Sequence, residues 1–345
     1  MTTNPPQRGV RPLPVAVLGG GSFGTCLAML LATQECRVDL WARDKTVADG
    51  INRHHRNPRY LREYRLPDTV AATTELEEAL HDKALVLSVL PSHAVRETWE
   101  KARAWTPGQA LVVSASKGIE VGTGLLMSQV LRKVLPDELQ ARLVFLSGPS
   151  FAREIAEGRA TVVSLASDHE AYAVAAQSIL SSERLRCYTN PDVLGVELGG
   201  ALKNVIAIAV GMVDGLEAGQ NARAAMITRG LAEITRLGVA LGAERETFQG
   251  LSGMGDLVLT CTGDLSRNRR VGLELGRGRK LDEILRDLGE VAEGVLTTRS
   301  TRDLARGLGL ELPIIEAVYA VLYEGLEPGE AGQRLMTRQL RSERD

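Results

Sequence analysis

The stretch P-V-A-V-L-G-G-G-S-F-G-T-C-L-A-M-L-L-A-T, residues Pro14–Thr33, decides the fold of this 345-residue chain. It begins with a short apolar run, Pro14–Leu18, whose composition is typical of a buried β-strand. The glycine-rich turn Gly19–Gly24 follows at once, and Thr25–Thr33 then has helix-forming composition. The motif G-x-G-x-x-G therefore lies between a strand and a helix, which is the context of a dinucleotide-binding site.

Each glycine of this motif has a physical role. Gly19 is expected to make the tight turn, Gly21 to let the backbone approach a pyrophosphate, and Gly24 to let the helix pack against the strand. The N-terminus of the helix then offers free N–H groups and a partial positive charge to the phosphates. We therefore predict a doubly wound α/β (Rossmann) domain that binds a dinucleotide.

The end of the second predicted strand, Arg37–Ala42, bears on the choice of cofactor. An acidic residue at this position usually binds the ribose 2′-hydroxyl of NAD, whereas an arginine suits the 2′-phosphate of NADP. Here the strand is followed by Arg43 and then Asp44. Because Arg43 comes first, we predict NADP as the preferred cofactor. NAD remains the alternative, and an ordinary surface Arg–Asp pair is a third interpretation.

Further apolar runs predict six more strands, at Thr69–Ala72, Ala84–Leu90, Ala110–Ala115, Leu143–Leu146, Ala160–Ala166 and Leu185–Tyr188. The carboxyl ends of parallel strands meet at one edge of a sheet, where ligands bind. Lys117 follows one of these strands, and Gly148 and Ser150 follow the next. We expect the three to hold an anionic or hydroxylated substrate, although a solvated loop lysine is an equal alternative. Ser150 is also predicted to cap a following helix.

After Asn190-Pro191 the strand signals stop and the remaining pattern is helical. We predict a disordered leader at 1–13, a Rossmann domain at 14–190, an all-helical domain at 191–337 and a charged tail at 338–345. Within the helical half, Val205–Val213 is apolar on nearly all sides and predicts a buried helix. Lys203 and Asn204 lie at its upstream end, where an unpaired charge would be costly. A lysine that extends to solvent from a helix end is the alternative.

Two downstream clusters carry further chemistry. Asp256 follows two glycines, and Thr260 is four residues later, so both share a face if a helix continues there. The run Ser266-Arg267-Asn268-Arg269-Arg270 places three arginines beside a helix-capping serine. A cap hydroxyl, free N–H groups and Arg267 together suit a phosphate, while a solvated charged face is the alternative.

Composition excludes several classes of partner. Lys+Arg number 41 against 43 Asp+Glu, for a net charge of -2, and aromatics are 4%, so nucleic acid is not an expected partner. The four cysteines include no C-x-x-C pair, so we expect no metal site and a reducing, cytoplasmic location. The apolar run is shorter than the ~20 residues that span a bilayer, so no membrane insertion is expected.

From Val15 to about Leu326 the sequence resembles the bacterial-type NAD(P)-dependent glycerol-3-phosphate dehydrogenases. The most specific segment is G-A-L-K-N-V-I-A-I-A-V-G-M-V-D-G-L-E-A-G-Q-N, residues 200–221. The resemblance implies a helical domain of the 6-phosphogluconate-dehydrogenase-like type and Lys203 as the catalytic base. It implies cofactor contacts from Ser22, Phe23, Arg43, Lys117, Ala152, Arg267, Val291 and Glu293. It implies substrate contacts from Lys117, Gly148, Ser150, Lys203, Asp256, Ser266, Arg267 and Asn268.

The implied reaction interconverts sn-glycerol 3-phosphate and dihydroxyacetone phosphate, and it supplies glycerol 3-phosphate for phospholipid synthesis. Asn204 and Thr260 are expected to orient the substrate or Lys203. A ketopantoate reductase or β-hydroxyacid dehydrogenase is a rival, but in those enzymes an asparagine stands four residues after the lysine, where this chain has Ala207. A non-catalytic NADP-binding sensor is a second rival, and it would be expected to lack Lys203, Asp256 or Arg267. The assembly is left open, with a homodimer as one candidate.

Overall fold

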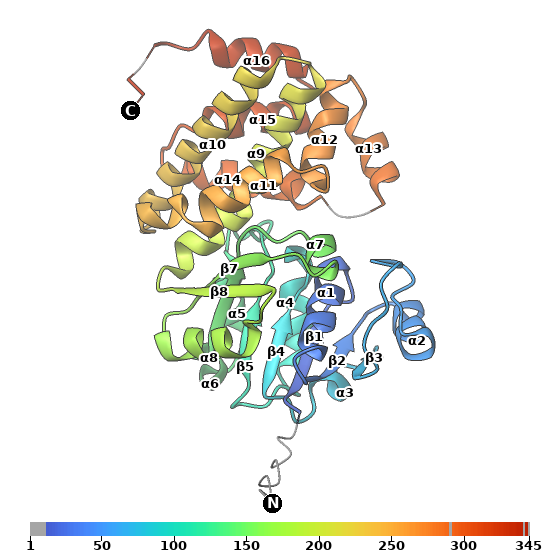
Figure 1. Ribbon diagram of the computed structural model, residues 1–345. Coiled ribbons are helices and arrows are strands. Elements are labelled where there is room, and N and C mark those ends of the chain that lie inside the picture. The colour runs from blue at the N-terminus through green and yellow to red at the C-terminus, as the bar shows by residue number, and fades with distance from the viewer. Residues whose placement is uncertain (1–11, 290–291, 341, 344–345) are drawn as a thin grey trace, which may run out of the picture.

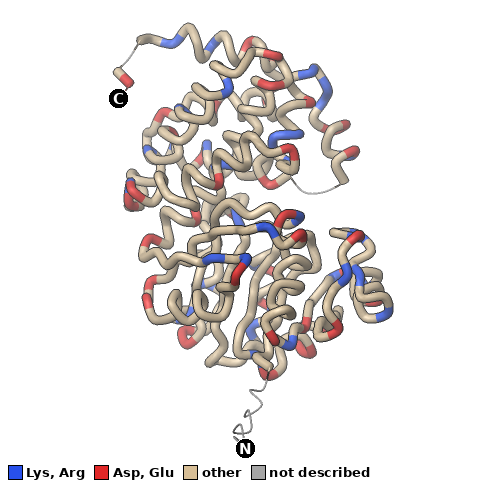
Figure 2. The backbone as a smooth tube through the Cα atoms, viewed as in Figure 1, with Lys and Arg blue, Asp and Glu red and all other residues tan. Residues whose placement is uncertain are grey.

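The computed structural model describes residues 12–289, 292–340 and 342–343, and it places a sheet-based half below a helical half (Figure 1). Most of the predicted leader, and Val291 among the predicted cofactor contacts, lie outside the described residues. Figure 2 shows acidic and basic residues interspersed along the backbone of both halves, as expected for a chain with nearly balanced charge.

The lower half is built on one sheet of eight strands in the order β3-β2-β1-β4-β5-β6-β7-β8. Neighbouring strands are parallel except β6 and β7, which pair antiparallel. This order, with a crossover from β3 back beside β1 to β4, confirms the doubly wound fold. The strands are β1 Pro14–Leu18, β2 Arg37–Trp41, β3 Val70–Thr73, β4 Leu85–Ser88, β5 Leu111–Ser114, β6 Leu143–Ser147, β7 Thr161–Ala166 and β8 Leu185–Asn190.

Helices cover the sheet of this half. They are α1 Ser22–Ala32, α2 Lys45–His54, α3 Leu76–Leu80, η1 Ser92–Ala94, α4 Val95–Ala102, α5 Met127–Val134, α6 Asp137–Gln140, α7 Ala152–Ala156 and α8 Glu170–Leu180. The sequence pattern did not predict α4 or α5. The predicted cap by Ser150 is wrong, because Phe151 is the N-cap of α7 and the Ser150 hydroxyl donates to the Gly148 carbonyl at 2.9 Å.

The upper half is helical, as predicted. Its elements are α9 Val193–Gly215, α10 Gln220–Ala240, η2 Arg245–Gln249, the π-helical turn η3 Leu251–Gly255, α11 Asp256–Thr262, α12 Arg267–Gly276, α13 Leu281–Leu288, α14 Glu293–Gly307, α15 Pro313–Tyr323 and α16 Pro328–Met336. The sequence pattern predicts this part of the chain as a helix over roughly Leu273–Arg277. Helix α12 begins six residues earlier, at Arg267, because Ser266 caps it. Helix α16 was not predicted.

Helix α9 is the centre of the upper half. The sequence pattern predicts this helix over Val193–Val213, and the structure extends it by two residues, to Gly215. In length and apolar composition it would suffice to cross a membrane. Buried helices of globular proteins also meet that criterion, and 89% of its most apolar window is buried inside the protein. The surrounding helices therefore account for its apolar surface.

The cores of the two halves interlock around the start of α9. Val193 and Val196, in the first turn of α9, pack in a cluster with strand residues of the lower half. In exchange, Ile119 and Leu126, from the loop between β5 and α5, pack in the core of the upper half. The site described below lies where the halves meet.

Candidate active site

The glycine-rich turn between β1 and α1 has the geometry that a pyrophosphate requires. Gly19 adopts a positive φ of 127°, and a Cβ there would lie 2.4 Å from the Val89 carbonyl oxygen. A Cβ on Gly24 would meet the Gly19 carbonyl oxygen at 1.9 Å. Around Gly21, in contrast, there is open space, and this residue is the N-cap of α1 with no side chain to bind the first N–H groups. Gly19 and Gly24 therefore make the tight turn and the close helix packing that the motif predicts, and the space at Gly21 is where the motif predicts a pyrophosphate.

Ser22 and Phe23, the first two residues of α1, are partly exposed beside this open space. At the end of β2, Arg43 is exposed, whereas Asp44 is the N-cap of α2 and accepts a hydrogen bond from the Thr46 N–H at 2.8 Å. This corner adjoins the turn, because a Cβ on Gly20 would lie 2.9 Å from the Ala42 Cβ.

Lys203 is buried in α9, with 8% of its surface exposed, and it is paired rather than extended to solvent. Its ammonium donates to Asp256 Oδ1 at 2.6 Å and to the Thr260 hydroxyl at 2.8 Å. Asp256 and Thr260 share one face of α11, as predicted, and Thr260 also donates to the Asp256 carbonyl at 2.6 Å. The structure thus excludes the alternative of a solvated helix-end lysine.

Glycines allow this approach of α11 to α9. A Cβ on Gly199 would lie 2.5 Å from the Ser252 carbonyl oxygen, so η3 can pass directly against α9 and carry Asp256 to Lys203. On the adjacent position, a Cβ on Gly200 would lie 2.5 Å from the Ser147 hydroxyl and 3.4 Å from Cδ of Lys117. The two glycines upstream of Lys203 therefore pack against different segments. Gly199 contacts the backbone of η3, and Gly200 contacts Ser147 and Lys117 near the strand ends.

Lys117 joins the two halves at this point. Its ammonium donates to Asp256 Oδ2 at 2.7 Å and to the Gly148 carbonyl at 3.4 Å. Lys117 is 17% exposed, and Ser150 is partly exposed next to Gly148. The lysine predicted at one strand end and the glycine–serine turn predicted at the next are thus brought together, and Asp256 is shared by two lysines.

Burial and charge act in opposite directions on this triad. Burial lowers the pKa of Lys203 to about 8, although the neighbouring Asp256 carboxylate raises it in part. Burial alone would raise the pKa of Asp256, but Lys117 and Lys203 outweigh it and hold the pKa below its usual range. Around neutral pH, Asp256 is therefore a carboxylate and Lys203 is an ammonium that can release its proton readily.

The predicted phosphate cluster is a helix N-terminus. The Ser266 side chain caps α12 by accepting from the Arg269 N–H at 3.2 Å, and Arg267 is the exposed first residue of the helix. Arg269 instead forms ion pairs with Asp214 at 2.7 Å and with Asp264 at 3.0 Å. Arg269 is therefore engaged in ion pairs within the protein. Arg267 is the arginine that directly follows the cap residue Ser266.

Two asparagines connect this cluster to Lys203. Asn268 is buried, and its Oδ1 accepts from the Gly294 N–H at 3.0 Å. A Cβ on Gly294 would meet Asn268 Oδ1 at 2.8 Å and the carbonyl oxygen of Asn204 at 2.7 Å. Asn204 and Asn268 therefore both lie against Gly294 at the start of α14.

Glu293, the first residue of α14, contacts the lower half directly. Its carboxylate accepts from the Ser92 N–H at 3.1 Å, and burial raises its pKa to about 7. Gly118 lies close by, because a Cβ there would meet the Ser92 Cβ at 2.7 Å. Sequence reasoning singled out Glu293 only through the family resemblance and missed its contact with Ser92, since no spacing links residues so far apart. Ala152 is the partly exposed first residue of α7.

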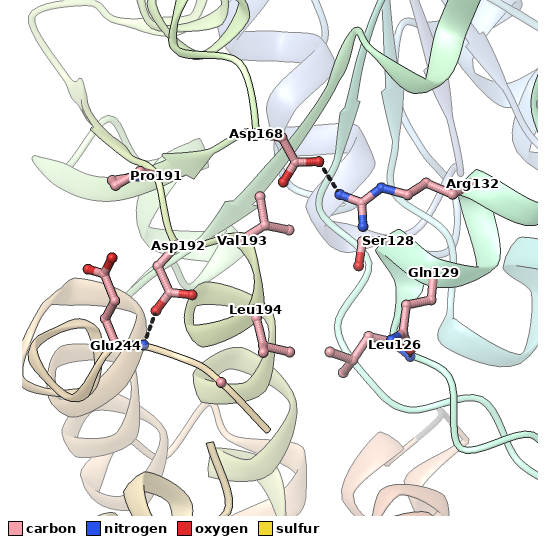
Figure 3. A pocket seen from close by; sticks show the side chains of 11 residues that line it. Leu126, Ser128, Gln129, Arg132, Asp168, Pro191, Asp192, Val193, Leu194 and Glu244 are labelled. Carbon is pink, nitrogen blue, oxygen red and sulfur yellow. Dashed lines mark hydrogen bonds and ion pairs between the residues drawn. The ribbon is translucent and has the colours of Figure 1, made fainter. Parts of the chain in front are cut away.

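A pocket of about 360 Å³ opens elsewhere, between α5, the start of α9 and the segment that joins α10 to η2 (Figure 3). Arg132 and Asp168 form an ion pair at its edge, and Asp192 accepts from the Glu244 N–H at 2.9 Å. No predicted site residue lines this pocket. Among the described residues, no group of three or more His, Cys, Asp or Glu side chains is arranged to hold a metal ion.

Comparisons with known proteins agree over nearly the whole chain. Residues 14–173 match the family model of the NAD-dependent glycerol-3-phosphate dehydrogenase N-terminus, and residues 192–333 match that of its C-terminus. The chain is 54% identical over 328 residues to a Myxococcus xanthus protein named glycerol-3-phosphate dehydrogenase (NAD(P)+), covering 95% of this chain and 98% of that one. It is 50% identical over 331 residues to a protein of the same name from Syntrophotalea carbinolica, covering 96% and 99%.

The chain is more similar to a solved glycerol-3-phosphate dehydrogenase than to a solved ketopantoate reductase. A crystal structure of glycerol-3-phosphate dehydrogenase from Coxiella burnetii is similar with a TM-score of 0.90 and 39% identity, over 95% of this chain and 100% of that one. A ketopantoate reductase from Ralstonia eutropha is similar with a TM-score of 0.61 and 16% identity, over 93% and 100%. The second likeness shows a shared fold alone.

Proposed function

This chain belongs to the family of NAD-dependent glycerol-3-phosphate dehydrogenases, and on that premise we propose that it interconverts sn-glycerol 3-phosphate and dihydroxyacetone phosphate with NAD(P). We propose further that it works in the cytoplasm and supplies glycerol 3-phosphate for phospholipid synthesis. NADP as the preferred cofactor, a homodimeric assembly and the domain boundary after Asn190 also remain proposals.

The residues present suit a nicotinamide dinucleotide. Open space at Gly21 and the uncapped N–H groups of α1 would receive the pyrophosphate, and Ser22 and Phe23 lie beside them. At the β2 end, Arg43 is exposed towards solvent, whereas Asp44 is already engaged as a helix cap, which supports a preference for the 2′-phosphate. When bound, the cofactor accepts or supplies the hydride at the substrate C2.

The acid–base role belongs to Lys203 in this proposal. During ketone reduction its ammonium donates a proton to the developing alkoxide at the C2 oxygen, and during oxidation the neutral amine accepts it. Asp256 and Thr260 hold the ammonium in place, because both accept its hydrogen bonds. Lys117, which is bound to the other oxygen of Asp256, adds positive charge where the oxyanion would form.

The substrate phosphate is assigned to the N-terminus of α12. Ser266 and Arg267 offer a capped helix start and a guanidinium, and Asn268 connects them to α14. Gly148 and Ser150 would face the glycerol end from the strand side. A dianionic substrate would thus be held by local positive charge in a chain whose net charge is -2.

One observation carries the proposal: Lys203 is buried between Asp256 and Thr260 at the meeting point of the two halves. The direct test follows the absorbance of NADPH at 340 nm with dihydroxyacetone phosphate. Wild-type protein should oxidise NADPH only when this ketone is present, whereas ketopantoate should give no signal. A protein that binds NADPH but reduces neither ketone would be the non-catalytic sensor.

Lys203→Ala tests the assigned role of the lysine. We expect a large loss of kcat with nearly unchanged binding of NADPH, because the turn at Gly19–Gly24 and the β2 end are untouched. If the variant kept more than about a tenth of wild-type kcat, a barrier increase below ~1.4 kcal/mol, Lys203 would not be the acid. Binding of NADPH is measured separately by fluorescence titration.

A further inference from the structure

A second arginine lies at the corner where the cofactor ribose is expected. Asp44 Oδ1 accepts from the Thr46 N–H, and Asp44 Oδ2 accepts from Nη1 of Arg59 at 2.5 Å. Both oxygens of the acidic residue at the β2 end are therefore engaged, one by α2 and one by the loop that follows it. The Arg59 side chain is 56% exposed, so its guanidinium can still reach a ligand.

The backbone of Arg59 is fixed by a buried asparagine. Asn57 has no exposed surface, and its Oδ1 accepts from the N–H groups of Arg59 at 3.0 Å and Tyr60 at 3.1 Å. Its Nδ2 donates to the Gly20 carbonyl at 2.9 Å and to the Thr25 hydroxyl at 2.8 Å. The loop that carries Arg59 is thus tied directly to the glycine-rich turn.

Three segments consequently meet at one corner. The turn touches the end of β2, because a Cβ on Gly20 would lie 2.9 Å from the Ala42 Cβ and 3.2 Å from Cγ1 of Val47. Arg43 and Asp44 follow Ala42 directly, and Arg59 is bound to Asp44. A dinucleotide whose pyrophosphate occupies the turn would therefore place its adenosine ribose among Arg43, Asp44 and Arg59.

We propose that Arg59 is a specificity-determining residue, which contacts the 2′-phosphate of NADP together with Arg43 and offsets the negative charge of Asp44. With NAD, Asp44 accepts the 2′-hydroxyl while it stays paired with Arg59, since a carboxylate has about four acceptor sites. The ion pair thus lets one corner accept either cofactor. This inference rests on the proposed function, because it concerns recognition of the same cofactor.

The test is a calorimetric titration of the full-length protein with NADP+ and NAD+, and with their fragments 2′,5′-ADP and 5′-AMP. Arg59→Ala should raise the Kd for NADP+ and 2′,5′-ADP by about tenfold, the scale of a lost charge-assisted hydrogen bond. The Kd for NAD+ and 5′-AMP should change by less than about threefold on the same scale. Asp44→Asn, which keeps the helix cap, should shift the preference the other way.

Arg65→Ala is the matched control, because Arg65 is an exposed arginine of the same loop that pairs with Asp68 at 3.0 Å, away from Asp44. It should leave all four Kd values unchanged. Equal losses of NADP+ and NAD+ binding in Arg59→Ala would overturn the proposal, because they would show that Arg59 only supports the loop. Failure of the proposed function is read separately, as a wild-type protein that does not reduce dihydroxyacetone phosphate with NADPH.

Discussion

At the scale of single residues, the pKa of Lys203 decides the pH range in which the proposed chemistry runs. Burial lowers this pKa to about 8, while the Asp256 carboxylate raises it and Lys117 lowers it further. Ketone reduction requires the ammonium form, so kcat/KM for dihydroxyacetone phosphate should fall as the pH rises through about 8. The two lysines share one carboxylate, so the observed limb belongs to the coupled group.

Asp256→Asn tests this account with little change of shape. Removal of the carboxylate takes away the charge that raises the pKa of Lys203, so the alkaline limb of kcat/KM should move to lower pH. We also expect a lower maximal kcat, because the amide holds the ammonium less firmly. The measurement is a pH profile with NADPH saturating, and the Kd for NADPH serves as the control. A limb that stays at the wild-type position would contradict the electrostatic role of Asp256.

The predictability of this site follows from how its contacts are made. Spacing alone placed Asp256 and Thr260 on one helical face, because that relation is local. The pairing of Lys203 with Asp256 depends on the packing of η3 against Gly199, which no local pattern encodes. The same reason explains why the Ser92–Glu293 contact was missed. The cap predicted for Ser150 failed because its hydroxyl binds the nearby Gly148 carbonyl instead.

At the scale of secondary-structure elements, glycines set the distance between α9 and α12. A Cβ on Gly272 would lie 2.0 Å from the Ile208 carbonyl oxygen, and one on Gly211 would lie 2.1 Å from the Arg269 carbonyl oxygen. Backbone atoms cannot move aside as a side chain can, so the two helices touch along this line. This contact carries the phosphate cluster at the start of α12 towards Lys203.

Gly272→Ala should therefore push α12 away from α9. We expect a destabilisation of at least about 1–3 kcal/mol, the usual range for overpacking. The KM for dihydroxyacetone phosphate should rise more than the KM for NADPH. Gly332→Ala is the matched control, because Gly332 lies within α16 and a Cβ there meets nothing within 4 Å. That variant should be as stable as wild type or more so, by up to about 1 kcal/mol. Urea denaturation of both variants decides between these outcomes.

A second element-scale prediction concerns Glu197, which connects α9 to α5. One oxygen of its carboxylate accepts from the Ser128 N–H at 2.8 Å, the other has no hydrogen-bond partner among the described residues, and burial raises its pKa to about 7. The nearby Arg132 and Asp168 have opposing effects. A folded-state pKa above the unfolded value of 4.5 favours folding at low pH, so this contribution is lost as the pH rises from about 4.5 to 7.

Glu197→Gln removes the titration. The difference in unfolding free energy, variant minus wild type, should therefore increase in favour of the variant as the pH rises from 5 to 8. For a shift of this size the increase is up to about 3 kcal/mol. The measurement compares urea midpoints of the two proteins at both pH values. An unchanged difference would mean that Glu197 does not titrate in this range. Glu233 and Glu293, whose pKa values burial also raises to about 7, keep a residual pH dependence in both proteins.

Prediction at this scale succeeded where the pattern was strong. The sheet followed from apolar β-branched runs, and α9 from a segment that is apolar on all sides. Helices α4 and α5 were missed because they are short and mix apolar with charged residues, so their signal is weak without the sheet on which they pack. The start of α12 was placed late because the charged run after Ser266 conceals its helical character.

At the scale of the whole molecule, the two halves exchange core residues. Val193 and Val196 complete the lower core, while Ile119 and Leu126 complete part of the upper one. The chain passes between the halves within a continuous helix, so neither core is complete without residues from the other side. This interlock holds the strand ends, which carry Lys117, against the helices that carry Lys203 and Asp256.

The interlock predicts that both halves unfold together, and the chain offers two natural probes. All three tryptophans, Trp41, Trp99 and Trp105, lie in the lower half, whereas most of the helix signal at 222 nm comes from the upper half. Urea curves followed by tryptophan fluorescence and by circular dichroism should therefore coincide. Two separate transitions would contradict a shared core.

Ile119→Ala sharpens this prediction, because Ile119 belongs to the lower half by sequence but packs in the upper core. Its truncation should cost about 2–5 kcal/mol, the range for a buried isoleucine, and should shift both urea curves by the same amount. Val121→Ala, at an exposed position of the same loop, is the control and should change stability by no more than about 0.5 kcal/mol. A shift of the dichroism curve alone would show that the upper half unfolds independently, and the strand ends and helices of the site would then be held together by the Lys117–Asp256 and Ser92–Glu293 contacts rather than by a common core.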